Sequence, residues 1–178
     1  MVSAVTTPAP AGPTARTLVL VRHSKASHDA LTDLERPLTP RGRDMADDLA
    51  RDLHLAVGDA DLLLVSPAAR ARQSAQPLQQ RLSPAETRVE PAIYHEGPSG
   101  ILSLVTALDD EVRTVVVVGH EPTVSVLAHM LHDTDDALAS QVSFGVPTAT
   151  ALILQVPTSW TGLGPRSAHL GRVLTAAR

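Results

Sequence analysis

The sequence predicts an α/β fold, a three-layer α/β/α sandwich around a mostly parallel central sheet. Short apolar runs rich in leucine and β-branched residues alternate along the chain with longer segments of helical periodicity, an order typical of βα units. The apolar runs are continuous, as expected of strands that helices cover on both faces. The chain has 178 residues, of which 43% are hydrophobic, and this suits one globular domain over residues 17–178.

Four apolar runs predict strands of this sheet. They cover residues 17–21 (TLVLV), 61–65 (DLLLV), 114–118 (TVVVV) and 149–156 (ATALILQV). Residues 88–93 are a weaker strand candidate, and the segment near residues 170–174 is interpreted as an edge strand.

The first helix is predicted to start at Pro40. Thr39 can cap it, and proline is favoured at the first helical position. Met45, Leu49 and Leu53 follow at fourfold spacing, which gives the helix one buried stripe.

A second helix is predicted after the run 61–65, with Ser66 and Pro67 as its start signal. Its apolar face comprises Ala71, Ala75, Leu78 and Leu82. Pro77 lies within this pattern, so we expect a kink or an early end there. Two further helices are indicated by apolar residues at helical spacing, one by Ile101, Leu104, Val105 and Leu108, the other by Val124, Leu127, Ala128 and Leu131 after Pro122.

Composition excludes several functional classes. The chain has no cysteine, which excludes disulfides, thiolate zinc sites and phosphatases with a cysteine nucleophile. The formal net charge of −4 provides no overall attraction to nucleic acid or to an anionic membrane.

Localisation is predicted from the N-terminal segment and from the hydropathy of the whole chain. Residues 1–16 are interpreted as a disordered tail, because they lack the basic start and the apolar stretch of a secretory signal. No segment is apolar enough to be interpreted as a membrane span. We therefore expect a cytoplasmic protein with no nucleic-acid or membrane partner.

Arginine and histidine residues follow three of the predicted strands. Arg22 and His23 end the first strand, Arg70 lies shortly after Ser66 and Pro67, and His120 follows the central strand. Ligands of open α/β sheets bind beyond the carboxyl ends of the strands. We therefore expect Arg22, His23, Arg70 and His120 to converge on one anion site.

These residue types suit phosphoryl transfer. Arg22 and Arg70 can each hold two oxygens of a phosphoryl group and keep their charge at working pH. His120 can donate a further hydrogen bond. His23 is the predicted nucleophile, because a neutral imidazole nitrogen can attack phosphorus and later leave when water attacks. Neighbouring arginines favour that neutral form by lowering the pKa of His23.

Four segments together resemble the histidine phosphatase superfamily, which has the phosphoglycerate-mutase-like fold. They read LVLVRHSKA, RPLTPRG, LLLVSPAARARQSA and VVVVGHEPT, within residues 17–156. The RHSKA and RPLTPRG segments are most similar to SixA-type phosphohistidine phosphatases. The resemblance implies a phosphate pocket of the same four residues, phosphorylation of His23 during turnover, and neither a metal ion nor an organic cofactor.

The sequence departs from the family pattern at two places. Ser24 stands where glycine usually follows the histidine. Many members also use a glutamate as the acid that protonates the leaving group, whereas residues 93–97 here read IYHEG. Glu96 and His95 are candidates for that acid, and a solvated loop position is the expected state of both.

A missing acid favours a substrate that needs little protonation. Imidazole leaves a P–N bond more easily than an alkoxide leaves an ester, so phosphohistidine on a partner protein is the first hypothesis for the substrate. A small phosphorylated metabolite hydrolysed in the same pocket is one alternative. A non-catalytic module that only binds phosphate is the other.

The remaining histidine cluster is interpreted as structural. His129 and His132 lie three residues apart and could reach one metal ion. They adjoin an acidic helix end and lack further ligands of suitable spacing, so no metal site is predicted.

Overall fold

The structure is a computed structural model that describes residues 15–177. Residues 1–14, most of the predicted tail, and residue 178 lie outside the described residues. The strands are β1 (Arg16–Arg22), β2 (Leu62–Val65), β3 (Glu86–Val89), β4 (Thr114–Gly119), β5 (Thr150–Val156) and β6 (His169–Thr175). The helices are α1 (Pro40–Val57), α2 (Ala69–Leu82), α3 (Ala92–His95), α4 (Gly97–Thr106), α5 (Thr123–Leu131) and α6 (Ala137–Ser143), with a 3₁₀ turn, η1, at Trp160–Gly162.

The strands form one six-stranded sheet in the order β3-β2-β4-β1-β5-β6. The neighbours from β3 to β1 pair in parallel, and β5 is antiparallel to both of its neighbours. Five of the six strands therefore run in one direction, so the predicted mostly parallel sheet is confirmed. Crossovers that contain helices explain the parallel pairing, because each one returns the chain to the end of the sheet at which the preceding strand began.

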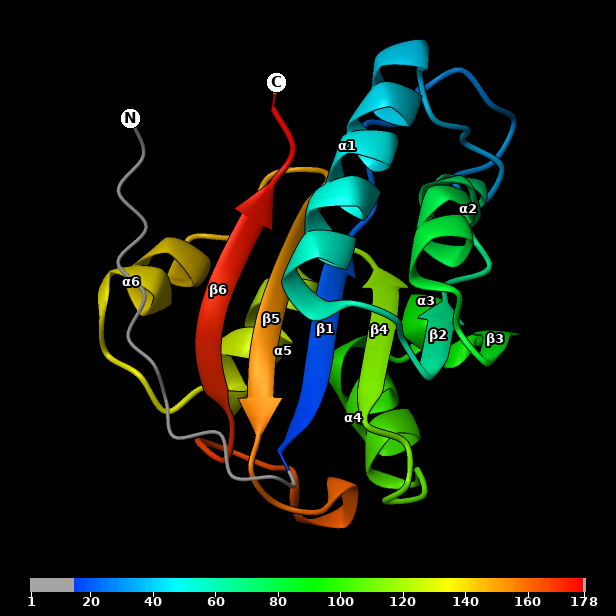
Figure 1. Cartoon of the computed structure of the whole chain (residues 1–178). Helices are drawn as coiled ribbons and strands as arrows, with labels where there is room; N and C mark the ends of the chain where they lie inside the picture. The colour runs from blue at the N-terminus through cyan, green and yellow to red at the C-terminus, as the bar shows by residue number, and fades with distance from the viewer. Residues whose placement is uncertain (1–14, 178) are drawn as a thin grey trace.

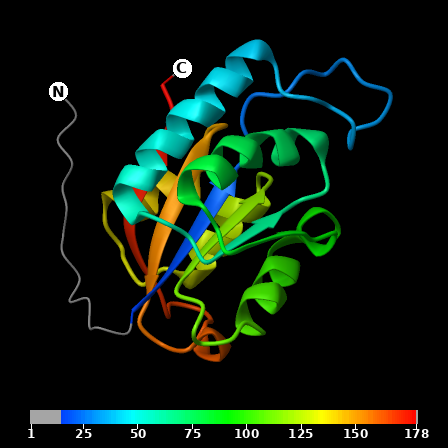
Figure 2. The same ribbon diagram turned by 45° about the vertical axis from the view of Figure 1, so that its right-hand side comes forward.

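Helices cover both faces of the sheet, which gives the predicted three layers. Figure 1 shows α1 and α2 in front of the sheet and α4 and α5 behind it. The turned view in Figure 2 separates α1 and α2 from the helices of the other layer. Alternate residues of β1 point into the two cores: Val19 and Val21 pack with α1 and α2, while Leu18 and Leu20 pack with α4 and α5. All four are at most 1% exposed, as expected of a strand buried on both faces.

The sequence correctly predicts where α1 begins. The Thr39 side chain accepts a hydrogen bond from the Gly42 N–H at 2.9 Å, and Pro40 is the first helical residue. Met45, Leu49 and Leu53 are buried against the sheet. At the other end, Gly58 closes the helix with φ of 72° and donates its N–H to the carbonyl of His54.

Three predictions about other elements need correction. The weak strand over residues 88–93 is β3 at Glu86–Val89, and Ala92 already begins α3. Ser66 does not cap α2, because Ala68 is the residue that precedes its first turn. Pro77 does not end α2, which continues to Leu82.

Two features of the fold escape the sequence patterns. The short helix α6 is capped by Asp136, whose carboxylate accepts from the N–H groups of Leu138 and Ala139. Its seven residues are too few for a visible periodicity. β1 begins at Arg16, which is 8% exposed and forms an ion pair of 3.0 Å with Asp110.

The described helices include none that is both long enough and apolar enough to cross a membrane.

Candidate active site

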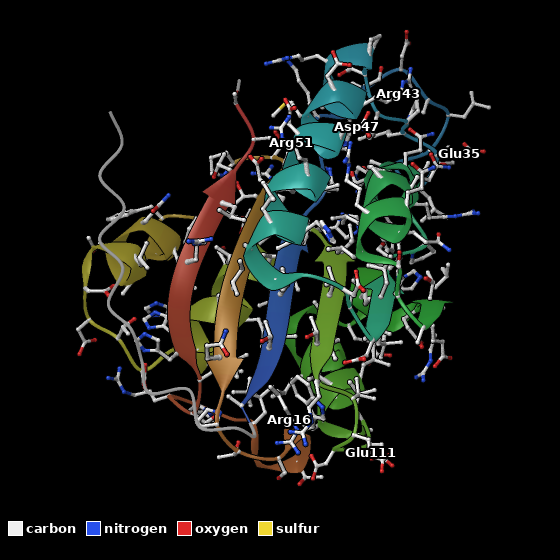
Figure 3. The ribbon with its side chains drawn as sticks, viewed as in Figure 1. Arg16, Glu35, Arg43, Asp47, Arg51 and Glu111 are labelled. Carbon is white, nitrogen blue, oxygen red and sulfur yellow. The ribbon has the colours of Figure 1, made fainter. Side chains whose placement is uncertain are left out.

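The register of the sheet brings three loop residues together. Arg22 at the end of β1 pairs with Gly119 at the end of β4, and Val65 of β2 pairs with Val118. The residues that follow these strand ends are His23, Ser66 and His120, and they therefore leave the sheet side by side. Figure 3 locates this end of the molecule: Glu35, in the loop after β1, lies at the opposite end from Arg16, the first residue of β1.

His23 has a defined tautomer. Its Nδ1 lies 2.7 Å from the carbonyl oxygen of Ser24, and a carbonyl can only accept, so Nδ1 carries the hydrogen. Nε2 is then unprotonated, and it accepts the Nε–H of Arg70 at 3.3 Å. The pKa of His23 is lowered to about 3, chiefly by burial; the hydrogen bond to Ser24 opposes this, and the His120, Arg70 and Arg22 side chains contribute to the lowering. The ring is thus neutral near pH 7, and the lone pair of Nε2 points to the Arg70 guanidinium.

His120 lies beside His23, with 5.2 Å between the ring centroids. Its Nε2 is 2.7 Å from Oγ of Ser66, and that oxygen also accepts the N–H of Ala68 at 3.3 Å. In the tautomer that carries its hydrogen on Nδ1, His120 accepts the Ser66 hydroxyl hydrogen at Nε2 and keeps Nδ1 as a donor. Burial lowers the pKa of His120 to about 4, with a further contribution from Arg70.

Arg22 is anchored on the other side of the site. Its Nη1 donates to the carbonyl of Val146 at 2.5 Å. The Val146 N–H in turn donates at 3.0 Å to Glu121, whose carboxylate also accepts the hydroxyl of Ser125. Glu121, next to His120 in sequence, thus fixes the segment that holds Arg22.

Arg70 is held by an aspartate that no sequence pattern identifies. Its Nη1 donates to the Asp33 carbonyl at 2.6 Å, and its Nη2 forms an ion pair of 2.8 Å with Asp33 Oδ2. The Tyr94 hydroxyl donates to the same oxygen at 2.8 Å, and the Tyr94 ring lies edge-on to His120 with 5.5 Å between centroids. Asp33 lies in an irregular loop 37 residues before Arg70, so no periodicity or strand end points to it.

The serine that replaces the expected glycine is built into the site. Ser24 is 1% exposed; its hydroxyl donates to the Gly42 carbonyl at 2.6 Å and its N–H donates to Ser74 Oγ at 2.8 Å. Ser74 also donates to the carbonyl of Arg70 at 2.7 Å. These bonds tie the residue after His23 to both α1 and α2.

Gly42 allows α1 to approach the same loop. A Cβ at this position would lie 2.0 Å from the carbonyl oxygen of Lys25. That oxygen accepts the N–H of Thr39 at 3.0 Å, so the loop after His23 and the start of α1 share one hydrogen-bonded corner.

Glu96 and His95 both lie at exposed positions. His95 contacts the Tyr94 ring edge-on at 4.9 Å between centroids, and Glu96 donates its N–H to the carbonyl of Ala92. The residue of this segment that reaches the site is Tyr94, through its contacts with Asp33 and His120.

The arrangement suits an oxyanion. Arg22 Nε and His120 Nδ1 are buried nitrogens with no hydrogen-bond partner among the described residues. Both can donate, and Arg70 adds a third donor group next to Nε2 of His23. An uncharged nucleophilic nitrogen among cationic and neutral donors fits the attack on a bound phosphoryl group. Among the described residues, no three His, Cys, Asp or Glu side chains are grouped so that they could hold a metal ion.

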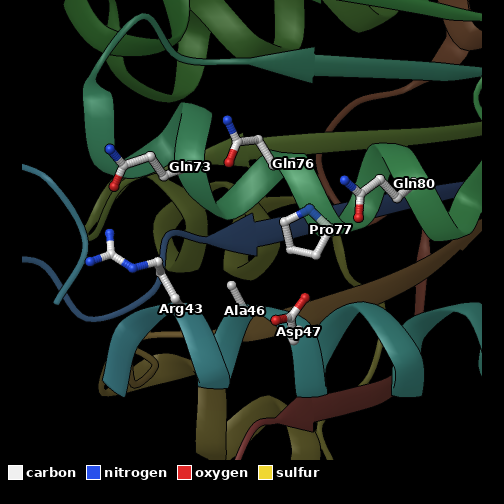
Figure 4. A pocket seen from close by; sticks show the side chains of 7 residues that line it. All are labelled: Arg43, Ala46, Asp47, Gln73, Gln76, Pro77 and Gln80. Carbon is white, nitrogen blue, oxygen red and sulfur yellow. The ribbon is translucent and has the colours of Figure 1, made fainter. Parts of the chain in front are cut away.

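Two hollows lie outside the four predicted residues. One, of about 180 Å³, lies between α1 and α2 and is lined mainly by polar side chains, as Figure 4 shows: Arg43, Ala46, Asp47, Gln73, Gln76, Pro77 and Gln80. The other, of about 490 Å³, adjoins the loop after His23 and is lined by Lys25, Arg41, Met45, Pro147 and Thr148.

Comparison with known proteins identifies relatives over most of the chain. The family model of the histidine phosphatase superfamily (branch 1) matches residues 18–94. An uncharacterised protein of Mycobacterium tuberculosis is 34% identical over 154 residues, which cover 84% of this chain and 96% of that protein. Phosphohistidine phosphatase SixA of Escherichia coli is 34% identical over 111 residues, which cover 61% of this chain and 69% of that enzyme.

A solved structure from Nakamurella multipartitia agrees with the fold. It carries a provisional assignment as phosphohistidine phosphatase SixA, is 30% identical, and superimposes with a TM-score of 0.84. The match covers 96% of this chain and all of that chain.

Proposed function

The chain belongs to the histidine phosphatase superfamily and is a phosphatase, and from this premise we propose that it dephosphorylates phosphohistidine on a partner protein through a phosphohistidine intermediate at His23. Arg22, Arg70 and His120 are assigned to the phosphoryl oxygens, and His23 to the phosphorus.

The state of the His23 ring is the observation that carries the proposal. The Ser24 carbonyl holds the hydrogen on Nδ1, and the unprotonated Nε2 accepts the Arg70 Nε–H at 3.3 Å, a donor that a phosphoryl oxygen can take over when substrate binds. Histidine without this bond could present either nitrogen, so the carbonyl selects the reactive one. The same hydrogen bond stabilises the positive charge that the ring gains when Nε2 bonds to phosphorus.

The reaction has two steps. Nε2 of His23 attacks phosphorus, and the P–N bond of the substrate breaks as its imidazole leaves. Water then attacks phosphorus, and the bond to Nε2 breaks to release inorganic phosphate. In both steps the transferring group bears its charge on oxygens that face Arg22, Arg70 and His120, so fixed donors stabilise the transition state without reorganisation.

Apolar side chains near the site support a protein as the substrate. Leu31 is 97% exposed and lies two residues from Asp33, and Phe144 is 94% exposed and lies two residues from Val146. Both side chains are therefore free to contact a protein that carries the phosphorylated histidine. The hollow beside Lys25 and Arg41 adds room and positive charge outside the phosphoryl site.

A substrate panel with a matched pair of variants tests the proposal. At equal concentrations, wild-type protein is expected to hydrolyse a phosphohistidine-bearing protein faster than sugar phosphates, nucleotide monophosphates or phosphoserine. His23→Ala should lose at least about a thousandfold in kcat/KM, whereas His28→Ala, in the exposed loop after the site, should keep its activity. Faster hydrolysis of small phosphate esters would favour a metabolite phosphatase, and phosphate binding without turnover would favour a binding module.

A further inference from the structure

We propose that the Asp33 carboxylate determines the leaving group of this site, by favouring a departing ring that presents an N–H and disfavouring an ester oxygen that departs as an anion. The proposal deepens the function proposed above and rests on it for the identity of the bond that is broken. None of the four residues predicted from the sequence supplies such an acceptor.

Asp33 shares Arg70 with the phosphoryl site. The Nε of Arg70 faces Nε2 of His23, while the two Nη atoms contact Asp33 at 2.6 and 2.8 Å. A phosphoryl group on His23 and the Asp33 carboxylate are therefore separated by one guanidinium group. The Asp33 side chain is 51% exposed, so its carboxylate is open to solvent beside Arg70, and the proposal places the leaving group of a bound substrate there.

Three neighbours hold the carboxylate in place. Oδ2 accepts from the Tyr94 hydroxyl and from Arg70, both at 2.8 Å, and Oδ1 accepts from Arg36 at 3.0 Å. Arg36 also donates to the Ser27 carbonyl at 2.8 Å, which fixes the loop that carries Asp33. Each carboxylate oxygen can accept more than one hydrogen bond, so Oδ1 keeps room for a further donor.

These contacts keep the carboxylate ionised. The hydrogen bond from Tyr94, followed by those from Arg70 and Arg36, lowers the pKa of Asp33 well below its usual range. Asp33 is therefore unable to give a proton to an alkoxide at working pH, and it is not the acid that the family pattern expects in residues 93–97. Its chemistry at the mouth of the site is that of an acceptor with a negative charge.

A charged acceptor at this place separates the two kinds of substrate. In the phosphohistidine reaction, Nε2 of His23 bonds to phosphorus and the P–N electron pair moves onto the departing ring. Before the attack, the ring nitrogen of the substrate that is not bonded to phosphorus takes a proton from solvent. The ring then leaves as neutral imidazole, and this N–H is donated to Asp33. In an ester reaction the electron pair moves onto oxygen, and the developing anion is repelled by the carboxylate.

Removing only the charge tests this assignment. Asp33→Asn keeps the shape and an oxygen that accepts from Arg70, whereas Asp29→Asn makes the same charge change at an exposed position of the same loop. The two probes are N-phosphoimidazole, which releases imidazole, and p-nitrophenyl phosphate, which releases an anion that needs no proton. The readout is the ratio of their kcat/KM values, with circular dichroism and Tm reporting that each variant is folded.

Asp33→Asn is expected to lower this ratio by roughly tenfold or more, the usual effect of one charge-assisted hydrogen bond. Hydrolysis of p-nitrophenyl phosphate should be unchanged or faster, and Asp29→Asn should keep the wild-type ratio. An unchanged ratio would overturn the proposal. If both kcat/KM values fell equally, Asp33 would only position Arg70; if neither fell, Asp33 would have no part in the reaction. The wild-type ratio taken alone tests the proposed function, so the two hypotheses fail separately.

Discussion

Arg70 donates its Nε–H to Nε2 of His23 across 3.3 Å. In the proposed reaction this guanidinium has two tasks: its charge keeps Nε2 of His23 unprotonated, and it binds the oxygens of the phosphoryl group under attack. The planar fork is needed for this, since it has five N–H groups, of which one contacts His23 and two hold Asp33, so two remain for phosphoryl oxygens.

Arg70→Lys is therefore expected to lower kcat/KM by about a hundredfold or more, because a lysine ammonium cannot contact His23, Asp33 and a phosphoryl oxygen in one plane. Steady-state kinetics with a phosphohistidine protein measures the effect. Arg72→Lys, at an exposed position of the same helix, is the control. Equal activities of the two variants would remove Arg70 from the site.

The pH dependence of the free enzyme follows from the two lowered histidine pKa values. A histidine is neutral above its pKa, so a pKa of about 3 keeps His23 nucleophilic throughout the range from pH 8 to pH 5. Acid inactivation should begin only as the pH approaches 3, where Nε2 of His23 gains a proton; protonation of His120 near pH 4 leaves its Nδ1 a donor. Nitrogen-15 NMR of the imidazoles is the direct measurement, and protonation of the His23 ring near pH 6.5 would contradict the structure.

Ser74→Ala removes a hydroxyl that joins the loop after His23 to α2. The buried N–H of Ser24 loses its acceptor and the carbonyl of Arg70 loses a donor. We expect a loss of about 1–3 kcal/mol in the free energy of unfolding and a lower kcat, measured by denaturant titration and by kinetics. Ser103→Ala, at an exposed position of α4, should change neither quantity, and a silent Ser74→Ala variant would argue against this connection.

Gly42→Ala tests the close approach of α1 to the loop after His23. Its new methyl group would stand 2.0 Å from the Lys25 carbonyl oxygen, so backbone must shift, at a cost of about 1–3 kcal/mol. Both Tm and kcat should fall. Gly171→Ala, where a Cβ meets nothing within 4 Å, is the matched control, and equal tolerance of both changes would contradict the hydrogen-bonded corner of Thr39, Lys25 and Gly42.

The sequence predicts the position of those strands that consist of one continuous, buried apolar run. The runs at residues 17–21, 61–65 and 114–118 are buried on both faces as β1, β2 and β4. β1 ends at Arg22 and is followed by His23, and β4 ends at Gly119 and is followed by His120. A strand end is readable from sequence because the change from apolar to polar residues is abrupt.

Features set by tertiary packing could not be predicted in this way. Ser66 has the sequence pattern of a helix start, yet its hydroxyl lies 2.7 Å from Nε2 of His120, a residue 54 positions away. Asp33 and Tyr94 likewise meet across 61 positions. Pro77 is tolerated within α2, where the burial of the helix against α1 and the sheet outweighs the lost hydrogen bond.

The central claim is that the imidazole of His23 carries the phosphoryl group during turnover. Rapid mixing with a protein labelled with radioactive phosphate on histidine, an alkaline quench and mapping of the labelled peptide test it most directly. The account predicts transient label that approaches one phosphate per chain, located on His23 and absent from His23→Ala. Turnover without labelled protein, or label on another residue, would contradict it.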